Sequence, residues 1–309
     1  MNTMKKTNLY FLAAATIMIL ATSCDHLDIP GMVINRSDTE ERVNDWIDYN
    51  VQNGEPIIEN APDTYLVYSS SDSHYCAADS IIPQSENDRL YQYITVERND
   101  PQALFSMLVG DLANEKGENP YNMVDASMRY NAETQAKNDP CFPTVGNHDV
   151  YFDCAKWFKK HYHTSTYTVT VKTVSGFKDL FIFLDSGNGT HGKRQMDWLK
   201  EKLSHRNEYR NCVVISHCWL FRTSYNYTTT PAANLPLDEQ YAFMDLMSQN
   251  NVSLVVMGHF HMREHREFNG IEYVMTDNLN EGTLKPSYMV MTCGDKVSYE
   301  YRELASSAL

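Results

Sequence analysis

Aspartate, asparagine and histidine residues occur at a few places in the sequence, each directly after a short apolar run. Their side chains offer oxygen and nitrogen donors without sulfur, which suits manganese, iron or zinc rather than a sulfur-rich structural zinc site. A single histidine after such a run is usually an ordinary loop residue. Five such positions in one chain instead indicate a shared metal site, and the residues concerned are Asp72, His74, Asp111, Asn147, His148, Asp149, His217, His259 and His261.

The apolar runs are rich in valine, isoleucine, leucine and phenylalanine, and longer polar stretches that permit helices separate them. Such runs are typical of strands buried on both faces of a sheet in an α/β fold. Ligands of layered α/β folds bind beyond the carboxyl ends of the strands, so the polar residues that follow the runs should meet there. Glycines precede Asp111, Asn147 and His259 and permit the backbone to turn sharply. The predicted strands are 65–68, 104–109, 142–145, 180–184, 212–215 and 254–257.

Taken in order, these residues read D-x-H, G-D, G-N-H-D, H and G-H-x-H between Asp72 and His261. This series resembles the five motifs of the calcineurin-like metallophosphoesterase family. The resemblance implies an α/β sandwich of two mixed β-sheets flanked by helices, with two bound metal ions (Mn, Fe or Zn, the identity left open). It implies that Asp72, His74 and His261 bind one metal, that Asn147, His217 and His259 bind the other, and that Asp111 bridges them.

The reaction that the resemblance implies is metal-dependent hydrolysis of a phosphate ester. His148 would stabilise the phosphoryl oxygens or protonate the leaving group, and Asp149 would orient the His148 ring. Asn114 stands where purple acid phosphatases carry a tyrosine, three positions after the G-D aspartate, which disfavours that branch. We expect a phosphodiesterase-type activity on a small extracytoplasmic substrate. The alternatives are a phosphomonoesterase or nucleotidase, and a catalytically silent metal-binding surface lipoprotein.

The first residues resemble a bacterial lipoprotein signal, with Lys5 and Lys6, an apolar run over 9–21 and small residues before Cys24. That run of 13 residues (21 − 9 + 1) is shorter than the roughly 20 needed to span a bilayer. We therefore expect a signal peptide over 1–23, with acylated Cys24 as the membrane anchor. A tether and a helix over 38–51 would occupy 24–63, and the metallophosphoesterase domain 64–309. The alternative is an ordinary cleaved signal peptide and a soluble periplasmic protein, so both interpretations place the protein outside the cytoplasm.

The chain is acidic, with a formal net charge of −14 over 309 residues. Removing 1–23, which holds two lysines and no acidic residue, makes the charge −14 − 2 = −16. Such a chain gains little from attraction to a phosphate backbone, which disfavours nucleic acid as the main partner and leaves a small-molecule phosphate ester. Beside Cys24, six of the seven cysteines remain, for which we expect zero to two disulfides. Cys76 and Cys218, each close after a predicted ligand histidine, are one candidate pair.

Overall fold

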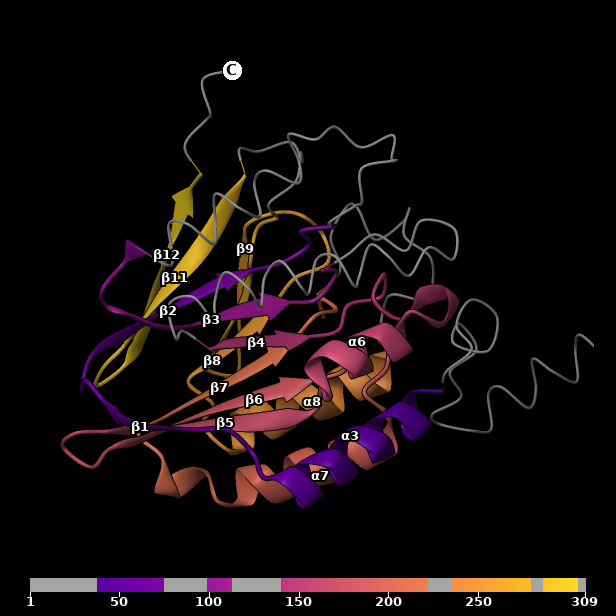
Figure 1. Ribbon diagram of the computed structural model, residues 1–309, viewed down its shortest axis with the longest axis horizontal. Coiled ribbons are helices and arrows are strands. Elements are labelled where there is room, and N and C mark those ends of the chain that lie inside the picture. The colour runs from indigo at the N-terminus through magenta and orange to yellow at the C-terminus, as the bar shows by residue number, and fades with distance from the viewer. Residues whose placement is uncertain (1–37, 75–98, 113–139, 222–234, 279–285, 305–309) are drawn as a thin grey trace, which may run out of the picture.

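Two β-sheets stacked face to face form the centre of the computed structural model, which describes residues 38–74, 99–112, 140–221, 235–278 and 286–304 (Figure 1). The larger sheet has seven strands in the order β1-β5-β6-β7-β8-β10-β9, and the smaller has five in the order β12-β11-β2-β3-β4. Both contain parallel and antiparallel pairs. The strands are β1 (Ile57–Ala61), β2 (Tyr65–Ser70), β3 (Ala103–Val109), β4 (Cys141–Thr144), β5 (Tyr167–Thr173), β6 (Lys178–Leu184), β7 (Asn211–Ser216), β8 (Leu254–Met257), β9 (Glu264–Phe268), β10 (Ile271–Met275), β11 (Ser287–Cys293) and β12 (Val297–Glu303).

The central strands read as continuous apolar runs because both of their faces are buried. In β6, Phe181 and Phe183 point into the core between the sheets, whereas Leu180 and Ile182 point to the opposite face and its helices. This alternation is the two-residue period of a strand. Neither face meets water, so no polar residue interrupts the run. The predicted strands are therefore confirmed, with ends that differ by one or two residues.

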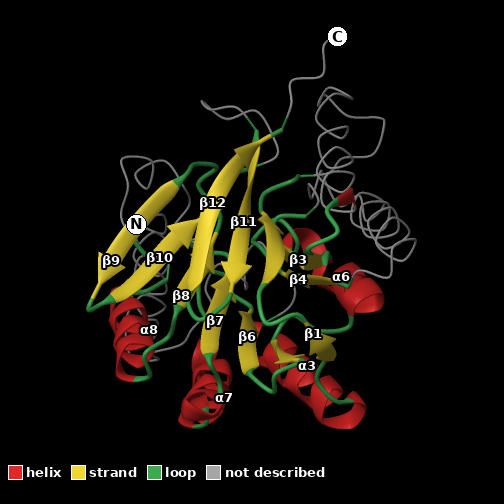
Figure 2. Cartoon of the chain, turned by 90° about the vertical axis from the view of Figure 1, so that its left-hand side faces the viewer, coloured by secondary structure: helices red, strands yellow, loops and turns green. Residues whose placement is uncertain are grey.

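Helices cover the outer face of each sheet. Along the larger sheet lie α3 (Thr39–Asn53), α7 (Gly192–Ser204) and α8 (Leu237–Gln249), as Figure 2 shows. The helix α6 (Ala155–Tyr162) packs on the outer face of the smaller sheet, where Phe158 joins Tyr68 and Leu108 in one apolar cluster. Two short 3₁₀ turns, η2 (Tyr151–Asp153) and η3 (Arg206–Glu208), complete the described elements. The predicted sandwich of two mixed sheets flanked by helices is confirmed.

The N-terminal part of the described chain contributes a strand as well as a helix. Asp38 caps α3, because its Oδ1 accepts the backbone N–H groups of Glu40 at 2.8 Å and Glu41 at 3.2 Å. The helix runs two residues beyond the predicted end and stops at Gly54, which has a φ of 81°. The following strand β1 pairs in parallel with β5 at the edge of the larger sheet, which the sequence analysis did not predict.

Several sequence predictions lie outside the described residues. They concern the signal peptide over 1–23, Cys24, the tether up to residue 37, Cys76 and Asn114. Within the described part of the chain, no helix has the length and apolar character needed to cross a membrane.

Candidate metal centre

The predicted ligands come from both sheets and meet at the edge where the parallel strands end. Asp72 and His74 follow β2, and Asp111 follows β3, its parallel neighbour in the smaller sheet. His217 follows β7, and His259 follows β8, its parallel neighbour in the larger sheet. The stacking of the two sheets therefore brings together residues that are far apart in sequence. His261 lies in the same loop as His259, and Asn147, His148 and Asp149 follow β4.

One group of ligand atoms consists of Asp72, His74 and His261, whose donor atoms lie within 4.8 Å of one another. The two imidazole Nε2 atoms of His74 and His261 are 3.1 Å apart. Asp72 Oδ1 lies 3.2 Å from His261 Nε2 and 3.9 Å from His74 Nε2. These three residues are the set that the sequence assigned to one metal.

A second group consists of Asp111, His217 and His259, again with donor atoms within 4.8 Å. Asp111 Oδ2 lies 3.2 Å from His217 Nε2, and the rings of His217 and His259 have centroids 5.2 Å apart. The same Oδ2 atom lies 3.8 Å from Nε2 of His74 in the first group. Asp111 thus faces both groups, as a carboxylate that bridges two cations must.

Buried atoms without a hydrogen-bond partner support the fit of this residue set to metal ions. Among the described residues, Asp72 Oδ1, Asn147 Oδ1, His217 Nε2 and both ring nitrogens of His259 are buried and have no hydrogen-bond partner. Buried polar atoms are normally hydrogen-bonded, because leaving them unpaired costs about 1–3 kcal/mol each. These unpaired atoms are oxygen and nitrogen donors of predicted ligands, and Asp72, His217 and His259 belong to the two groups described above, where coordination to cations would satisfy them.

The ligands are oriented by hydrogen bonds behind them. Asn147 Nδ2 donates to the hydroxyl of Tyr151 at 3.2 Å, which leaves Oδ1 as the amide atom available to a metal. Asp72 Oδ2 accepts the backbone N–H of His259 at 3.0 Å and the hydroxyl of Ser71, so Oδ1 faces the histidines. Asp111 Oδ1 accepts the backbone N–H of His148 at 2.8 Å, which turns Oδ2 inward. Such supporting bonds hold ligands in one orientation.

The loops that carry the ligands have unusual backbone conformations. Left-handed φ values are uncommon for residues other than glycine and cluster at functional sites, where surrounding structure compensates for the strain. Here two backbone bonds hold the strained loop after β2: Asp72 N–H donates to Gly110 O and His74 N–H to Asp111 O, both at 3.0 Å. Five predicted ligands have such φ values: Asp72 (52°), His74 (43°), Asp111 (50°), His259 (86°) and His261 (55°).

Two glycines are required beside the ligands. Gly110 has a φ of 80°, and a Cβ atom there would lie 2.4 Å from Nδ1 of His217. Gly146 does not have a left-handed φ, but a Cβ atom there would lie 2.2 Å from Oδ1 and 2.4 Å from the backbone nitrogen of Asp111. Gly110 therefore makes the sharp turn that the sequence predicted. Gly146 is required for a different reason, because the loop that carries Asp111 passes too close to leave room for a side chain.

The carboxylates and histidines perturb one another's protonation. Burial opposes charge on Asp72 and Asp111, yet the neighbouring histidines outweigh it and hold the pKa of both carboxyls below the ordinary value. Burial would lower the pKa of His217, but Asp111 and Asp72 raise it to about 10. Burial, reinforced by nearby histidines, lowers the pKa of His74 and His259 to about 3. At neutral pH these two rings are neutral, the form that binds metals.

His148 lies at the open side of the centre. Its ring centroid is 4.6 Å from that of His74 in an edge-on arrangement, and its side chain is only partly buried. It also lies with His74 and Asp111 in a third group of potential ligands. The structure therefore brings His148 to the centre, beside His74 and Asp111.

Asp149 is fully buried and binds two backbone amides. Its Oδ1 accepts the N–H of Leu112 at 2.9 Å, and its Oδ2 accepts the N–H of Gly146 at 2.8 Å. These amides belong to the loops after β3 and β4, so Asp149 joins the loop that carries Asp111 to the loop that carries Asn147. The predicted role of orienting His148 stays a prediction beside this observed one.

Supporting residues outside the motifs were not predicted. Ser71, Tyr151 and Ser186 hold the ligands or their backbone, but serine and tyrosine are common, and nothing in their spacing distinguishes them. Cys218, considered as a disulfide partner of Cys76, is a buried thiol whose Sγ donates to the carbonyl oxygen of Ser186 at 3.0 Å.

Two mixed sheets with a cluster of Asp, Asn and His ligands at their shared edge are the architecture of a metallophosphoesterase. The sequence profile described as calcineurin-like phosphoesterase matches residues 67–263, and the chain belongs to this family. The predicted membership is confirmed, and the protein is a hydrolase that acts on phosphate esters. No curated protein sequence matches the chain.

Solved structures share the fold at low sequence identity. A dimetal phosphatase from Danio rerio is 11% identical with a TM-score of 0.60, over 78% of this chain and 96% of that chain. Purple acid phosphatase PPD1 from yellow lupin (Lupinus luteus) seeds is 14% identical with a TM-score of 0.58, over 80% of this chain and 53% of that one. GAP50 of Plasmodium, the anchor in the inner membrane complex, is 10% identical with a TM-score of 0.55, over 79% and 85%.

Proposed function

We propose that this phosphoesterase is a dimetal phosphodiesterase that acts on a small extracytoplasmic ester and is anchored to a bacterial membrane through Cys24. The observation that carries the catalytic part is the position of His148, partly exposed and edge-on to His74 beside the two ligand groups. An ionisable side chain at the open face of a buried ligand cluster can act on the ester while the ligands behind it remain fixed.

The protein residues divide into those that hold cations and those that handle the ester. Asp72, His74 and His261 would hold one cation, and Asn147, His217 and His259 the other, with Asp111 between them. Two bound cations would polarise the phosphoryl oxygens and activate a water molecule as the nucleophile. His261 has 37% of its side chain exposed whereas Asp72 has none, so the ester approaches from the side of His261 and His148.

His148 handles the leaving group. Its backbone N–H donates to Asp111 Oδ1 at 2.8 Å, which holds the backbone that carries the ring beside this carboxylate. From there its ring N–H donates a hydrogen bond to a phosphoryl oxygen or a proton to the departing ester oxygen. The substrate class with the greatest need for that proton is an ester of a poorly acidic alcohol, whose alkoxide leaves slowly.

The charge of the centre favours a diester. No lysine or arginine of the described residues pairs with Asp72 or Asp111. Arg263, close in sequence to His261, pairs instead with Asp277 at 3.0 Å. A diester carries one negative charge, whereas a monoester carries about 1.5 to 2 at neutral pH and needs more compensating positive charge. Within the described part of the chain, only the bound cations would supply it.

Hydrolysis assays separate the proposed activity from a monoesterase. The purified protein beginning after Cys24, loaded with manganese, iron or zinc, is given bis-p-nitrophenyl phosphate and p-nitrophenyl phosphate. We expect metal-dependent release of nitrophenol with a higher kcat/KM for the diester. A higher value for the monoester would establish the phosphomonoesterase or nucleotidase instead.

The anchoring is tested in cells. Wild type and Cys24→Ala are expressed in a bacterium fed an alkyne-labelled fatty acid, followed by membrane fractionation. Label and membrane association in wild type only are the expected result. An unlabelled, soluble, shortened wild-type protein would show the ordinary cleaved signal peptide.

A second candidate is a metal-binding surface protein without turnover. The resemblance of the fold to GAP50, the anchor in the inner membrane complex of Plasmodium, favours it. Such a protein would bind two metals and hydrolyse neither ester. That result in the assays above would favour this candidate over the phosphodiesterase.

A further inference from the structure

The helix α3 lies outside the part of the chain that matches the family, because it ends at Asn53 and the match begins at residue 67. Nevertheless its first turns contact the loop over 185–191 that joins β6 to α7. In Figure 1 this end of α3 lies toward the edge where the parallel strands finish. The contacts made by this end connect it to a metal ligand.

The strongest contact is a buried ion pair. Arg42 donates from Nε at 3.0 Å and from Nη2 at 2.9 Å to Oδ2 of Asp185. The side chain of Arg42 is 6% exposed and that of Asp185 is not exposed at all. The other carboxylate oxygen of Asp185 accepts the backbone N–H of Gly187 at 2.8 Å. Arg42 therefore fixes the carboxylate around which the loop after β6 turns.

Two further residues of α3 hold the remainder of the same loop. The carboxylate of Glu40 accepts the backbone N–H groups of Lys193 and Arg194 in the first turn of α7. The first backbone N–H groups of a helix have no partner within the helix, and Glu40 accepts two of them. It takes the place of an N-cap side chain, because the side chain of the N-cap residue His191 makes no capping hydrogen bond. Thr39 Oγ1 accepts from Asn188 Nδ2 at 3.2 Å.

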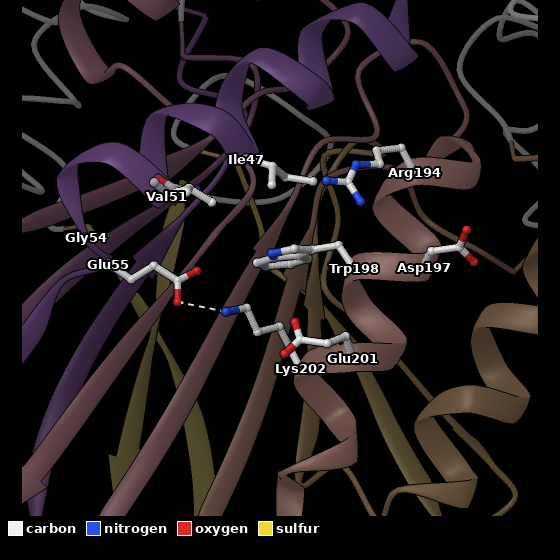
Figure 3. A pocket seen from close by; sticks show the side chains of 10 residues that line it. Ile47, Val51, Gly54, Glu55, Arg194, Asp197, Trp198, Glu201 and Lys202 are labelled. Carbon is white, nitrogen blue, oxygen red and sulfur yellow. Dashed lines mark hydrogen bonds and ion pairs between the residues drawn. The ribbon is translucent and has the colours of Figure 1, made fainter.

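Farther along, α3 and α7 are separated by a groove of about 500 Å³, shown in Figure 3. Ile47, Val51 and Trp198 line it, and an ion pair of 3.1 Å between Lys202 and Glu55 crosses its far end. The polar contacts of α3 with the loop over 185–191 described above come from the first turns of the helix. A substitution there can therefore break them without changing the ion pair at the far end of the groove.

The loop that α3 holds supports the backbone of a metal ligand. Ser186, the residue after Asp185, accepts with its hydroxyl the backbone N–H of His217 at 3.1 Å and that of Cys218 at 2.9 Å. The Ser186 carbonyl accepts the Cys218 thiol. Ser186 is fully buried, and these bonds set where the backbone of His217 leaves β7.

We propose that α3 positions the metal ligand His217, with Arg42 acting through Asp185 and Ser186. Arg42 is not one of the predicted ligands and acts on His217 only through other residues, so it is a positioning residue. Removing a group that hydrogen-bonds a metal ligand typically changes metal affinity by about 10–100-fold, and loss of Arg42 should displace such a group, Ser186, together with its loop. The inference rests on the metal centre of the proposed function and does not depend on its substrate.

The test compares four variants with wild type: Arg42→Met, Asp185→Asn, the double variant and Lys202→Met. Lys202→Met is the control, because it breaks the ion pair between α7 and Glu55, two residues after the end of α3, at the far end of the groove. Manganese or zinc is titrated against a competing chelator to obtain both binding constants. Hydrogen exchange over 185–191 and 216–219, and the melting temperature, are measured on the same samples.

We expect Arg42→Met to weaken one of the two binding constants by about 10–100-fold and to raise exchange in both segments. The double variant removes the unpaired buried carboxylate and should recover melting temperature without recovering metal affinity. Lys202→Met should retain both binding constants. If α3 had only a structural role, metal affinity and melting temperature would change together instead of separately.

Unchanged binding constants in Arg42→Met, or equal losses in Arg42→Met and Lys202→Met, would overturn the proposal. If Arg42→Met is insoluble, Glu40→Ala replaces it, with a smaller loss at the same metal expected and an unchanged affinity counting against the proposal. A wild type that binds two metals but hydrolyses no ester contradicts the proposed function alone. A wild type that binds no metal contradicts both.

Discussion

Nδ1 of His217 donates a hydrogen bond of 2.7 Å to the backbone carbonyl oxygen of Val109. This bond turns Nε2 toward Asp111 Oδ2, 3.2 Å away. Val109 ends a strand of the smaller sheet, and His217 follows a strand of the larger one. A ligand carried by one sheet is thus oriented by the other, so the stacking of the sheets is part of the metal centre.

Metal binding should release protons, because His217 must lose one before it binds a cation. Its pKa is raised to about 10 in the metal-free protein, so the ring is protonated at neutral pH. Apparent metal affinity should therefore rise with pH between about 6 and 9. Calorimetry in buffers of different ionisation enthalpy measures the protons released, and His217→Asn should release fewer. Equal proton release from both proteins would show that His217 is not the source.

The same pKa predicts how the metal-free protein responds to pH. The folded pKa of about 10 lies above the ordinary 6.5, so protonated His217 contributes stability that is fully present below about pH 6.5. This contribution is lost as pH rises toward 10. Urea unfolding of metal-free protein at pH 6.5 and pH 9.5 should show a decline that is smaller in His217→Asn.

Asp111→Ala should remove both metals, since Asp111 Oδ2 faces His217 of one ligand group and His74 of the other. Turnover should fall by at least about 10³-fold, because cations contribute several kcal/mol to the transition state. Metal analysis by mass spectrometry after gel filtration gives the stoichiometry. Retention of about two metals per chain in this variant would contradict the bridging role.

His148→Ala should keep metal and lose about 10²–10⁴-fold in kcat, the usual contribution of a general acid. The metal content of this variant distinguishes a general acid from a ligand, because a donor atom of His148 also lies within 4.8 Å of donor atoms of His74 and Asp111. Loss of one metal in His148→Ala would make it a ligand. An assay with a substrate whose leaving group is strongly acidic should show a smaller loss, since such a group needs no proton.

Gly146→Ala should destabilise the protein by about 1–3 kcal/mol, as overpacking of an interior does. The added Cβ would lie 2.4 Å from the backbone nitrogen of Asp111, which cannot move as a flexible side chain would. Metal affinity should fall with stability, because Asp111 is displaced. Gly294→Ala is the control: the nearest atoms to its Cβ belong to the Thr64 side chain, at 3.3 Å, and Thr64 lies at the opposite end of β2 from Asp72. Equal effects of the two substitutions would contradict this account.

The sequence by itself identified the strands that carry the centre. Strands such as β6 and β7 are buried on both faces, and that burial leaves an apolar run that is visible without any structure. The ligands follow those runs, so their meeting at one edge could be predicted from the parallel order of an α/β fold. The roles of the individual ligands and the membrane anchor stay predictions.

Only the tertiary structure decided how the ligands are held. Asp149 joins two loops through backbone amides, and Arg42 pairs with Asp185 across 143 positions of sequence. The edge strand β1 and the left-handed backbone at Asp72 were equally invisible in the sequence. Burial on both faces of a strand extends over successive residues and leaves an apolar run, whereas a single contact between distant segments repeats nowhere and becomes apparent only when the sheets are stacked.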